Sequence, residues 1–332
     1  MTEFILLLLS VVAAGVPMIG YLLLMRWMDR YEREPLGLVA AAFGWGAVGA
    51  ISIAIIGSLI LILPLELALD EGMATFLSAS LVAPIVEEPA KALCLLLLYR
   101  SREFDNATDG FVYGAAAGLG FGMSENFLYF ASTVGEGVGA WVFTVIIRTL
   151  FTGLMHAAAT SMVGAALGWA KFSTSSLRAA ALPLALLSAV GMHATWNFFV
   201  IVPEAFEEWG ALPLVSFLLF PLEFITLFVI FQASLYSESH LIRRELKEEA
   251  RLGHLPPEHV AKFASWSQRR QHRTWTPRGV DGDEYIKVAT KLAFRKKQRD
   301  ARPEDSFYAE DVDLLRGRLR ELLSGPSPAQ RT

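Results

Sequence analysis

The sequence predicts an all-α membrane protein, a polytopic bundle of about seven transmembrane helices followed by a polar, partly helical tail. Hydrophobic residues make up 54% of the 332 residues and charged residues 19%, against roughly 45–50% and about 25% in soluble domains. The charges are unevenly distributed, since residues 1–235 hold only 9 of the 29 Lys and Arg residues. A mean hydropathy of +0.42 excludes a disordered protein and favours several membrane spans.

Two further counts exclude other classes of protein. The single cysteine, Cys94, excludes a disulfide framework and a thiolate metal cluster. The net charge of -4 is too small to imply a nucleic-acid partner, and the basic excess lies only in the tail. The partner expected for residues 1–235 is therefore the lipid bilayer.

Seven apolar stretches are long enough to cross a hydrocarbon core about 30 Å thick, which needs roughly 20 helical residues. They are expected at residues 4–25, 36–63, 73–99, 110–132, 141–170, 177–200 and 212–235. The first starts with an acidic rather than a basic segment and continues past residue 18, so we expect a retained span and not a signal peptide. The stretch 137–171 is too long for one upright helix and is expected to begin with a tilted or interfacial piece.

The basic residues of the connections give an independent prediction of topology. Those near the ends of spans one, three and five are Arg26, Arg30, Arg33, Arg100, Arg102, Lys171 and Arg178. The connections 64–72, 133–140 and 201–211 contain no Lys or Arg. Under the positive-inside rule, this alternation places the N-terminus outside and the C-terminus in the cytoplasm, after an odd number of spans.

Residues 236–332 are expected to form a separate cytoplasmic tail that is partly helical and partly disordered. Helix-favouring patterns occur around 238–251, 287–299 and 311–323. A Gly-Pro-Ser-Pro end is typical of disorder. The basic run 295–299 is interpreted as a solvated face, with a contact to anionic lipid as the alternative.

Ionisable side chains within the spans are the main indication of function, because each costs about 2.5–3.5 kcal/mol at the centre of a transmembrane helix. Spans three to six carry Glu87, Glu88 and Lys91; Glu125 with Asn126; Arg148 and His156; and His193 with Asn197. Counting from the span ends at about 1.5 Å per residue places the glutamates and histidines between the bilayer centre and its outer half. Four helices are thus expected to direct polar groups at one level. For Arg148 alone, an ion pair to a neighbouring helix or snorkelling is the preferred interpretation.

Helix spacing supports a shared site. Lys91 lies i+4 from Glu87 and i+3 from Glu88, so it can pair with either carboxylate. Small residues at Gly114 and Gly118 recur every four positions and predict that another helix packs closely against the fourth span.

These side chains can support hydrolysis of a peptide bond. Two adjacent carboxylates in low dielectric cannot both ionise cheaply, so Glu87 and Glu88 offer an acid and a base side by side. Lys91 would stabilise this pair. Asn126 and Asn197 are the neutral amides available to hold an oxyanion, although interhelical hydrogen bonding is an equally good interpretation of both.

The residues leave two mechanisms open. In one, His156, His193 and Glu125 supply three ligands to a hydrolytic metal, and Glu87 or Glu88 takes a proton from water. In the other, the two carboxylates activate water directly and the histidines bind the oxyanion.

Several motifs occur in order along these spans. They are Glu-Glu-x-x-Lys (Glu87, Glu88, Lys91), Phe-x-x-x-Glu-Asn (Phe121, Glu125, Asn126), the histidine His156 and His-x-x-Trp-Asn (His193, Trp196, Asn197). Together with the segment 29–35 they resemble the PrsW family of intramembrane proteases over about residues 20–200, which leaves the tail outside the similarity.

The resemblance implies a membrane metallopeptidase, distantly similar to the CAAX-processing prenyl-protein proteases, in a bacterial inner or plasma membrane. It implies a membrane-anchored regulatory substrate such as an anti-sigma factor. By position, Glu87 and Glu88 become the catalytic pair, and Glu125, His156 and His193 become supporting or metal-binding residues for a divalent metal, zinc before others.

Two other functions use the same residues differently. Buried Glu, His and Lys side chains also form proton relays, so a proton- or cation-coupled transporter is one alternative; it lacks support because no inverted repeat is evident. A non-catalytic scaffold, in which the polar residues join helices and the tail recruits a partner, is the other.

Overall fold

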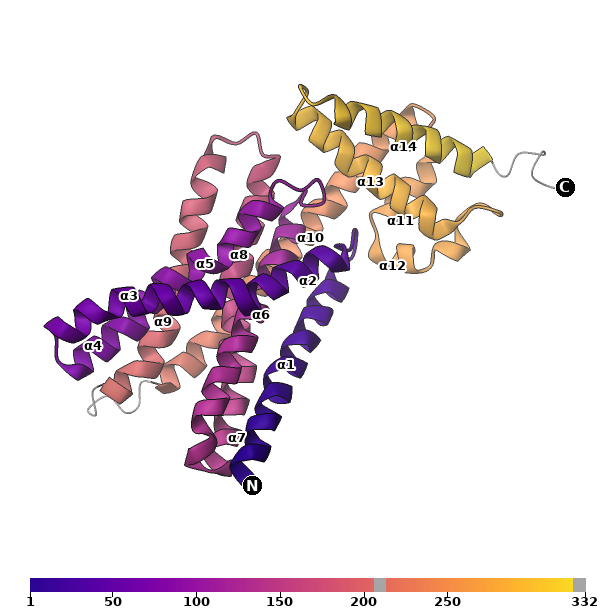
Figure 1. Cartoon of the computed structure of the whole chain (residues 1–332). Helices are drawn as coiled ribbons and strands as arrows, with labels where there is room; N and C mark the ends of the chain where they lie inside the picture. Colours follow the sequence, from indigo (N-terminus) through magenta and orange to yellow (C-terminus); the bar gives the residue numbers. More distant parts are fainter. Residues whose placement is uncertain (206–212, 325–332) are drawn as a thin grey trace. The chain divides into compact units, whose positions relative to one another are not determined.

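The computed structural model describes residues 1–205 and 213–324, and every regular element within these two ranges is a helix (Figure 1). The predicted all-α class is confirmed. The Gly-Pro-Ser-Pro end, for which disorder is predicted, and most of the connection 201–211 lie outside the described residues.

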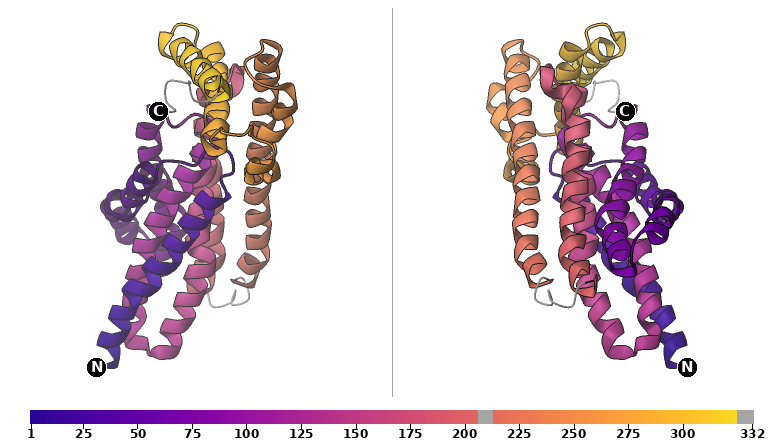
Figure 2. Two further views of the ribbon diagram at one scale, coloured as in Figure 1. Left: turned by 90° about the vertical axis from the view of Figure 1, so that its right-hand side faces the viewer. Right: turned by 90° about the vertical axis from the view of Figure 1, so that its left-hand side faces the viewer.

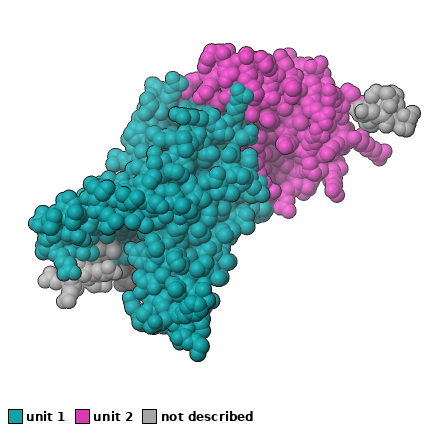
Figure 3. All heavy atoms as spheres, in the orientation of Figure 1, with its two compact units in different colours: residues 1–28, 34–171, 175–231 teal, residues 29–33, 172–174, 232–332 magenta. Residues whose placement is uncertain are grey.

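The chain divides into two compact units (Figure 3). Unit 1 comprises residues 1–28, 34–171 and 175–231, and unit 2 comprises residues 29–33, 172–174 and 232–332. Unit 2 therefore takes in two short connecting segments besides the tail.

The helices of unit 1 follow the predicted spans closely. They are α1 (Thr2–Met28), α2 (Leu36–Gly44), α3 (Ile51–Ala68), α4 (Glu71–Leu77), α5 (Ala83–Leu98), α6 (Ala107–Ser132), α7 (Val138–Ile147), α8 (Gly153–Lys171), α9 (Ala181–Ala205) and the first part of α10 (Pro213–Arg251). The π-helical segments Trp45–Ala50, Ser78–Val82 and Arg148–Thr152 join α2 to α3, α4 to α5 and α7 to α8.

Five helical stretches in the described residues are long and apolar enough to cross a membrane. They are Thr2–Met28, Leu36–Ala68, Val138–Lys171, Ser176–Val200 and Phe224–Arg251. The predicted third and fourth spans are helical but fall outside this set. Their composition is less apolar, because α5 carries two glutamates and a lysine and α6 is rich in Gly and Ala.

The central helix of unit 1 is α6, which packs against α1, α2 and α8. Figures 1 and 2 show α1, α6 and the α7–α8 helix running alongside one another. Fifteen consecutive residues of α6, from Thr108 to Gly122, are buried. A helix covered on all sides by protein needs less apolar surface than one facing lipid, which explains its composition.

The backbones of α6 and α8 lie in close contact, and this contact places His156 of α8 beside Gly118 of α6. A Cβ atom at Gly118 would lie 2.3 Å from the carbonyl oxygen of His156, and one at Gly114 would lie 2.4 Å from that of Thr160. The predicted close approach to the small-residue stripe is confirmed, and the approaching helix is α8.

Unit 2 is a helical unit with its own core. Its helices are the end of α10, α11 (Val260–Phe263), α12 (Trp266–Arg270), α13 (Gly282–Ala301) and α14 (Ser306–Ser324). The buried core includes Ile242, Phe263, Tyr285, Leu292 and Leu319. The three predicted tail helices lie within α10, α13 and α14.

The connecting segment 29–33 is bound within unit 2 by a buried arginine. Arg269 donates from Nη1 to the carbonyl oxygen of Tyr31 at 2.8 Å and from Nε to that of Phe263 at 2.7 Å. The hydroxyl of Tyr31 in turn donates to the carbonyl oxygen of Ala264 at 3.1 Å. These contacts explain why residues so early in the chain belong to the same compact unit as the tail.

The solvated-face interpretation of the basic run is wrong for three of its five residues. Arg295, Lys296 and Gln298 are buried. Arg295 Nε donates to Asp311 Oδ2 at 2.8 Å, and Lys296 Nζ lies 2.8 Å from Glu249 Oε1. Acidic partners on α10 and α14 compensate these cations, a cross-helix effect that local sequence does not reveal.

Acidification is expected to destabilise unit 2 through Glu249. Burial alone would raise the pKa of this carboxyl, but hydrogen bonds from Arg316, Lys296 and His254 lower it from 4.5 to about 2. A depressed folded-state pKa stabilises the fold above the unfolded value and loses that contribution as the pH falls toward the folded value. The free energy of unfolding of the full chain, followed by the loss of helical circular dichroism, should decrease as the pH falls from about 4.5 to about 2.

Glu249→Gln is the control for this prediction. The variant should lose stability at neutral pH and show a smaller decline over the same acidic interval. Identical pH profiles for the variant and the wild type would contradict the assignment.

Candidate active site

The predicted polar groups come together in unit 1. Glu87, Glu88 and Lys91 lie on α5, Glu125 lies on α6, His156 on α8 and His193 on α9. Glu88, Lys91 and His156 are 0% exposed. The glutamates and the lysine share one face of α5 because they are spaced i, i+3 and i, i+4.

Among the three glutamates of the site, Glu88 makes the most hydrogen bonds. Its Oε1 accepts from Lys91 Nζ at 2.8 Å and contacts His193 Nδ1 at 2.8 Å. Its Oε2 accepts from the hydroxyl of Thr160 on α8 at 3.5 Å. Because an ionised carboxylate only accepts hydrogen bonds, the contact with Oε1 places a proton on Nδ1 of His193 and leaves Nε2 as its acceptor.

Lys91 places an ammonium group between three acceptors. Its Nζ lies 3.3 Å from Glu87 Oε2 and 2.9 Å from His156 Nδ1, in addition to its contact with Glu88. It also lies 4.0 Å from the centre of the Phe121 ring, a cation–π geometry. A permanent partner for adjacent carboxylates is what their burial requires.

The ring of His156 is held from both sides. Its Nε2 lies 2.6 Å from Glu125 Oε2, and its Nδ1 faces Lys91. Its ring centre is 4.9 Å from that of His193, in an edge-to-face arrangement. The Glu125 carboxylate fixes the proton on Nε2, so Nδ1 presents its lone pair toward the other site residues.

Glu125 also binds Arg148, the first residue of the π-helical segment before α8. Arg148 Nη2 lies 2.7 Å from Glu125 Oε2. Its Nε donates to Asn126 Oδ1 at 3.1 Å. The predicted ion pair of Arg148 to a neighbouring helix is thus present, and its partner is a residue of the site itself.

The two predicted asparagines are placed differently. Asn126 is buried beside Arg148, and its amide nitrogen has no hydrogen-bond partner within the described ranges. Asn197 donates from Nδ2 to the carbonyl oxygen of Ala79 at 2.8 Å and so joins α9 to the π-helical segment Ser78–Val82.

Thr160 contacts the site but was not predicted from the sequence. It lies i+4 from His156, so the two side chains share one face of α8. That spacing is the signal that could have identified it.

Three buried side chains have the geometry of a metal-binding group. Ligand atoms of Glu87, His156 and His193 all lie within 4.8 Å of one another. One carboxylate and two imidazoles form a common ligand set for hydrolytic zinc. The predicted set contained Glu125 in place of Glu87. In the structure Glu125 instead bonds the far nitrogen of His156, as carboxylates behind metal-binding histidines commonly do. The residues present therefore fit a divalent metal.

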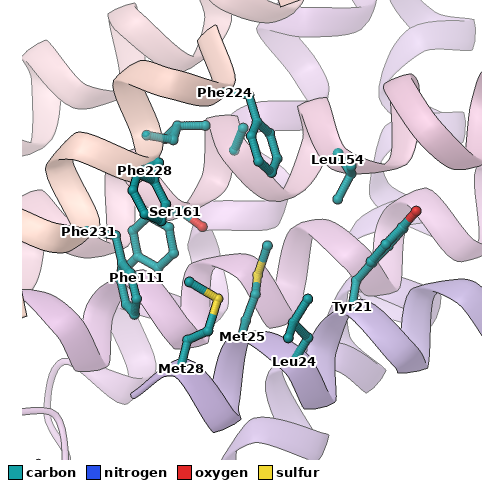
Figure 4. Close-up of a pocket in the computed structure, with 12 residues that line it drawn as sticks. Tyr21, Leu24, Met25, Met28, Phe111, Leu154, Ser161, Phe224, Phe228 and Phe231 are labelled. Carbon is teal, nitrogen blue, oxygen red and sulfur yellow. The ribbon is translucent and has the colours of Figure 1, made fainter. Parts of the chain in front are cut away.

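A separate apolar cavity of about 270 Å³ lies in unit 1 (Figure 4). Its walls come from α1, α6, α8 and α10, with residues such as Met25, Phe111 and Phe228. On α8 it is lined by Leu154, Ala158 and Ser161, whose spacing puts them on a different face from His156 and Thr160. None of the described residues lining it is a predicted site residue.

Comparison with known proteins agrees with this geometry. A family model described as "PrsW family intramembrane metalloprotease" matches residues 34–230. The chain is 30% identical over 210 residues to Protease PrsW of Bacillus subtilis (strain 168), covering 62% of this chain and 88% of that protein. It is 30% identical over 200 residues to Protease PrsW of Geobacillus kaustophilus (strain HTA426), covering 60% of this chain and 80% of that protein.

A third relative, Protease PrsW of Clostridioides difficile (strain 630), is 26% identical over 209 residues, which cover 62% of this chain and 84% of that protein. No solved structure matches the chain. The matches favour the protease interpretation over the transporter and the scaffold. On the extent of the family match, with carboxylates and histidines gathered among apolar helices, this chain belongs to the PrsW family of intramembrane metalloproteases.

Proposed function

We propose that the protein hydrolyses a peptide bond in or near the membrane segment of a regulatory protein, such as an anti-sigma factor, with water activated by a glutamate and assisted by zinc. The observation that carries the proposal is the convergence of Glu87, Glu88, Lys91, His156 and His193 in one buried cluster. Buried ionisable groups among apolar helices are costly and are retained for function.

The contacts support a division of roles. Glu87, His156 and His193 are the residues that would hold the metal, which when bound supplies a Lewis acid for the scissile carbonyl. Glu88 is the proposed general base, because among the described residues its Oε2 has only the long contact with Thr160 and keeps a lone pair for a proton. Lys91 balances the charge of the carboxylate pair.

The remaining predicted residues take supporting roles. Glu125 orients His156 rather than binding the metal directly. Asn126 retains donors on its amide nitrogen and stays a proposed contact for the oxyanion. Asn197 is proposed to hold α9 in place through Ala79.

We also propose the full topology of seven spans, with the N-terminus outside and residues 236–332 in the cytoplasm of a bacterial cell. The alternation of basic connections supports this topology. The proposed location is the bacterial plasma membrane, in keeping with the bacterial relatives.

Cleavage by purified protein in proteoliposomes tests the proposal, with single-span anti-sigma-factor-like proteins as substrates. Glu88→Gln should lower the cleavage rate by about 10²–10⁴-fold, the usual contribution of general base catalysis. Glu87→Gln should abolish cleavage through loss of a ligand. Both variants must retain the helical circular dichroism of the wild type.

Glu66→Gln is the matched control, because it makes the same chemical change at an exposed position of α3. It should cleave at the wild-type rate. Wild-type cleavage by both Glu87→Gln and Glu88→Gln would remove the proposed mechanism.

A further inference from the structure

We propose that Arg148 is a positioning residue, which holds Glu125 and, through it, the ring of His156 in the orientation that a metal ligand needs. This inference rests on the proposed function in one respect, namely that His156 binds the metal. Arg148 lies at the start of the π-helical segment that precedes α8 and does not belong to the family motifs from which the site was predicted.

Arg148 and His156 share one oxygen of the Glu125 carboxylate. Glu125 Oε2 lies 2.7 Å from Arg148 Nη2 and 2.6 Å from His156 Nε2. The guanidinium and the imidazole therefore bind the same atom from two sides. A carboxylate held by a permanent cation cannot turn away from the histidine without breaking a short ion pair.

Arg148 is itself held in place by α6. Its Nε donates to Asn126 Oδ1 at 3.1 Å, and its guanidinium carbon lies 3.6 Å from the centre of the Tyr129 ring. Glu125, Asn126 and Tyr129 are consecutive or one turn apart on α6. One planar guanidinium thus makes an ion pair, a hydrogen bond and a stacking contact with a single helix, which only arginine can do.

The Glu125 carboxylate in turn determines which nitrogen of His156 carries the proton. With its proton held on Nε2 by Glu125, the neutral ring has its lone pair on Nδ1, which faces Lys91 Nζ at 2.9 Å. Removing the partner behind a metal-binding histidine typically lowers metal affinity by about 10–100-fold. In the part of the chain that the structure describes, the polar contacts of Arg148 are with Glu125 and Asn126 and not with Glu87, His156 or His193, so its effect is expected to pass through Glu125.

A double-mutant cycle tests this route. The variants are Arg148→Met, Glu125→Gln and the two combined, and the readout is Zn²⁺ affinity measured by competition with a chromogenic chelator. Arg148→Met should weaken Zn²⁺ binding by about 10–100-fold. The combined variant should bind no more weakly than Glu125→Gln alone, because the arginine has nothing left to position.

A second readout needs no metal. The ¹⁵N chemical shifts of the His156 ring, assigned by their loss in His156→Gln, report which nitrogen carries the proton. Metal-free wild type should show a single tautomer protonated on Nε2, and Arg148→Met should show a mixture. Arg148→Lys, which keeps the charge but not the planar group, should fall between them.

Arg251→Met is the control, because it removes an exposed arginine at the end of α10. It should leave the affinity, the shifts and the cleavage rate unchanged. If Arg148→Met alone fails to fold because Glu125 is left unpaired, the Zn²⁺ affinity of the combined variant can still be compared with that of Glu125→Gln. A weaker affinity of the combined variant would contradict the positioning role.

The outcomes separate this inference from the proposed function. Unchanged Zn²⁺ affinity and unchanged His156 shifts in Arg148→Met, or additive losses in the cycle, would overturn the positioning role even if the wild type cleaves its substrate. A wild type that neither binds Zn²⁺ nor cleaves would overturn the proposed function, while the metal-free shifts would still decide the role of Arg148.

Discussion

Lys91→Met is expected to destabilise the folded protein by about 3–5 kcal/mol, the usual cost of leaving a buried charge without its partner. The Lys91 ammonium is fully buried and lies within 3.3 Å of both Glu87 and Glu88. Methionine fills a similar volume but leaves two adjacent carboxylates uncompensated. Thermal or denaturant unfolding of the purified protein in mild detergent should show the loss.

The combined variant Lys91→Met, Glu88→Gln separates charge from packing. Neutralising one carboxylate removes most of the repulsion, so the combined variant should regain a large part of the lost stability. Equal instability of the single and the combined variant would mean that the lysine acts through the packing of its stem. It would not then be the counter-charge of the site.

Gly118→Ala is expected to prevent close packing of α6 against α8 and to cost more than the about 1–3 kcal/mol typical of overpacked cores. The added Cβ would lie 2.3 Å from the His156 carbonyl oxygen and 2.7 Å from the Cα of Ala157. Both are backbone atoms, which cannot move aside as a flexible side chain can. The helices must separate, and His156 then moves away from Glu125 and Lys91. We therefore expect a lower melting temperature together with loss of cleavage.

Gly15→Ala in α1 is the matched control, since a Cβ there has no other atom within 4 Å. The same substitution should leave the melting temperature unchanged or slightly higher, because alanine favours the helix over glycine. A similar decrease in melting temperature for both variants would contradict the packing explanation.

The fold class, the positions of the long helices and the ionisable residues of spans three to six could all be predicted from the sequence alone. These follow from local properties. A run of apolar residues must be helical in a membrane, because its backbone groups have no other partner. The pairing of Lys91 with Glu87 and Glu88 also follows locally, since it lies within one helix and depends only on residue spacing.

The contacts between helices could not be predicted from the sequence and are known only from the three-dimensional structure. A span that is apolar on all sides gives no sign of which face meets which neighbour. The group that could hold a metal therefore contains Glu87 where the sequence suggested Glu125. Arg148, for which the sequence predicted an ion pair without a named partner, pairs with Glu125, the carboxylate bonded to His156. The burial of Lys296 against Glu249 in unit 2 is likewise a contact between two helices that the sequence does not reveal. Rotation and packing of helices fix these pairs, and neither property is encoded in the periodicity of a single segment.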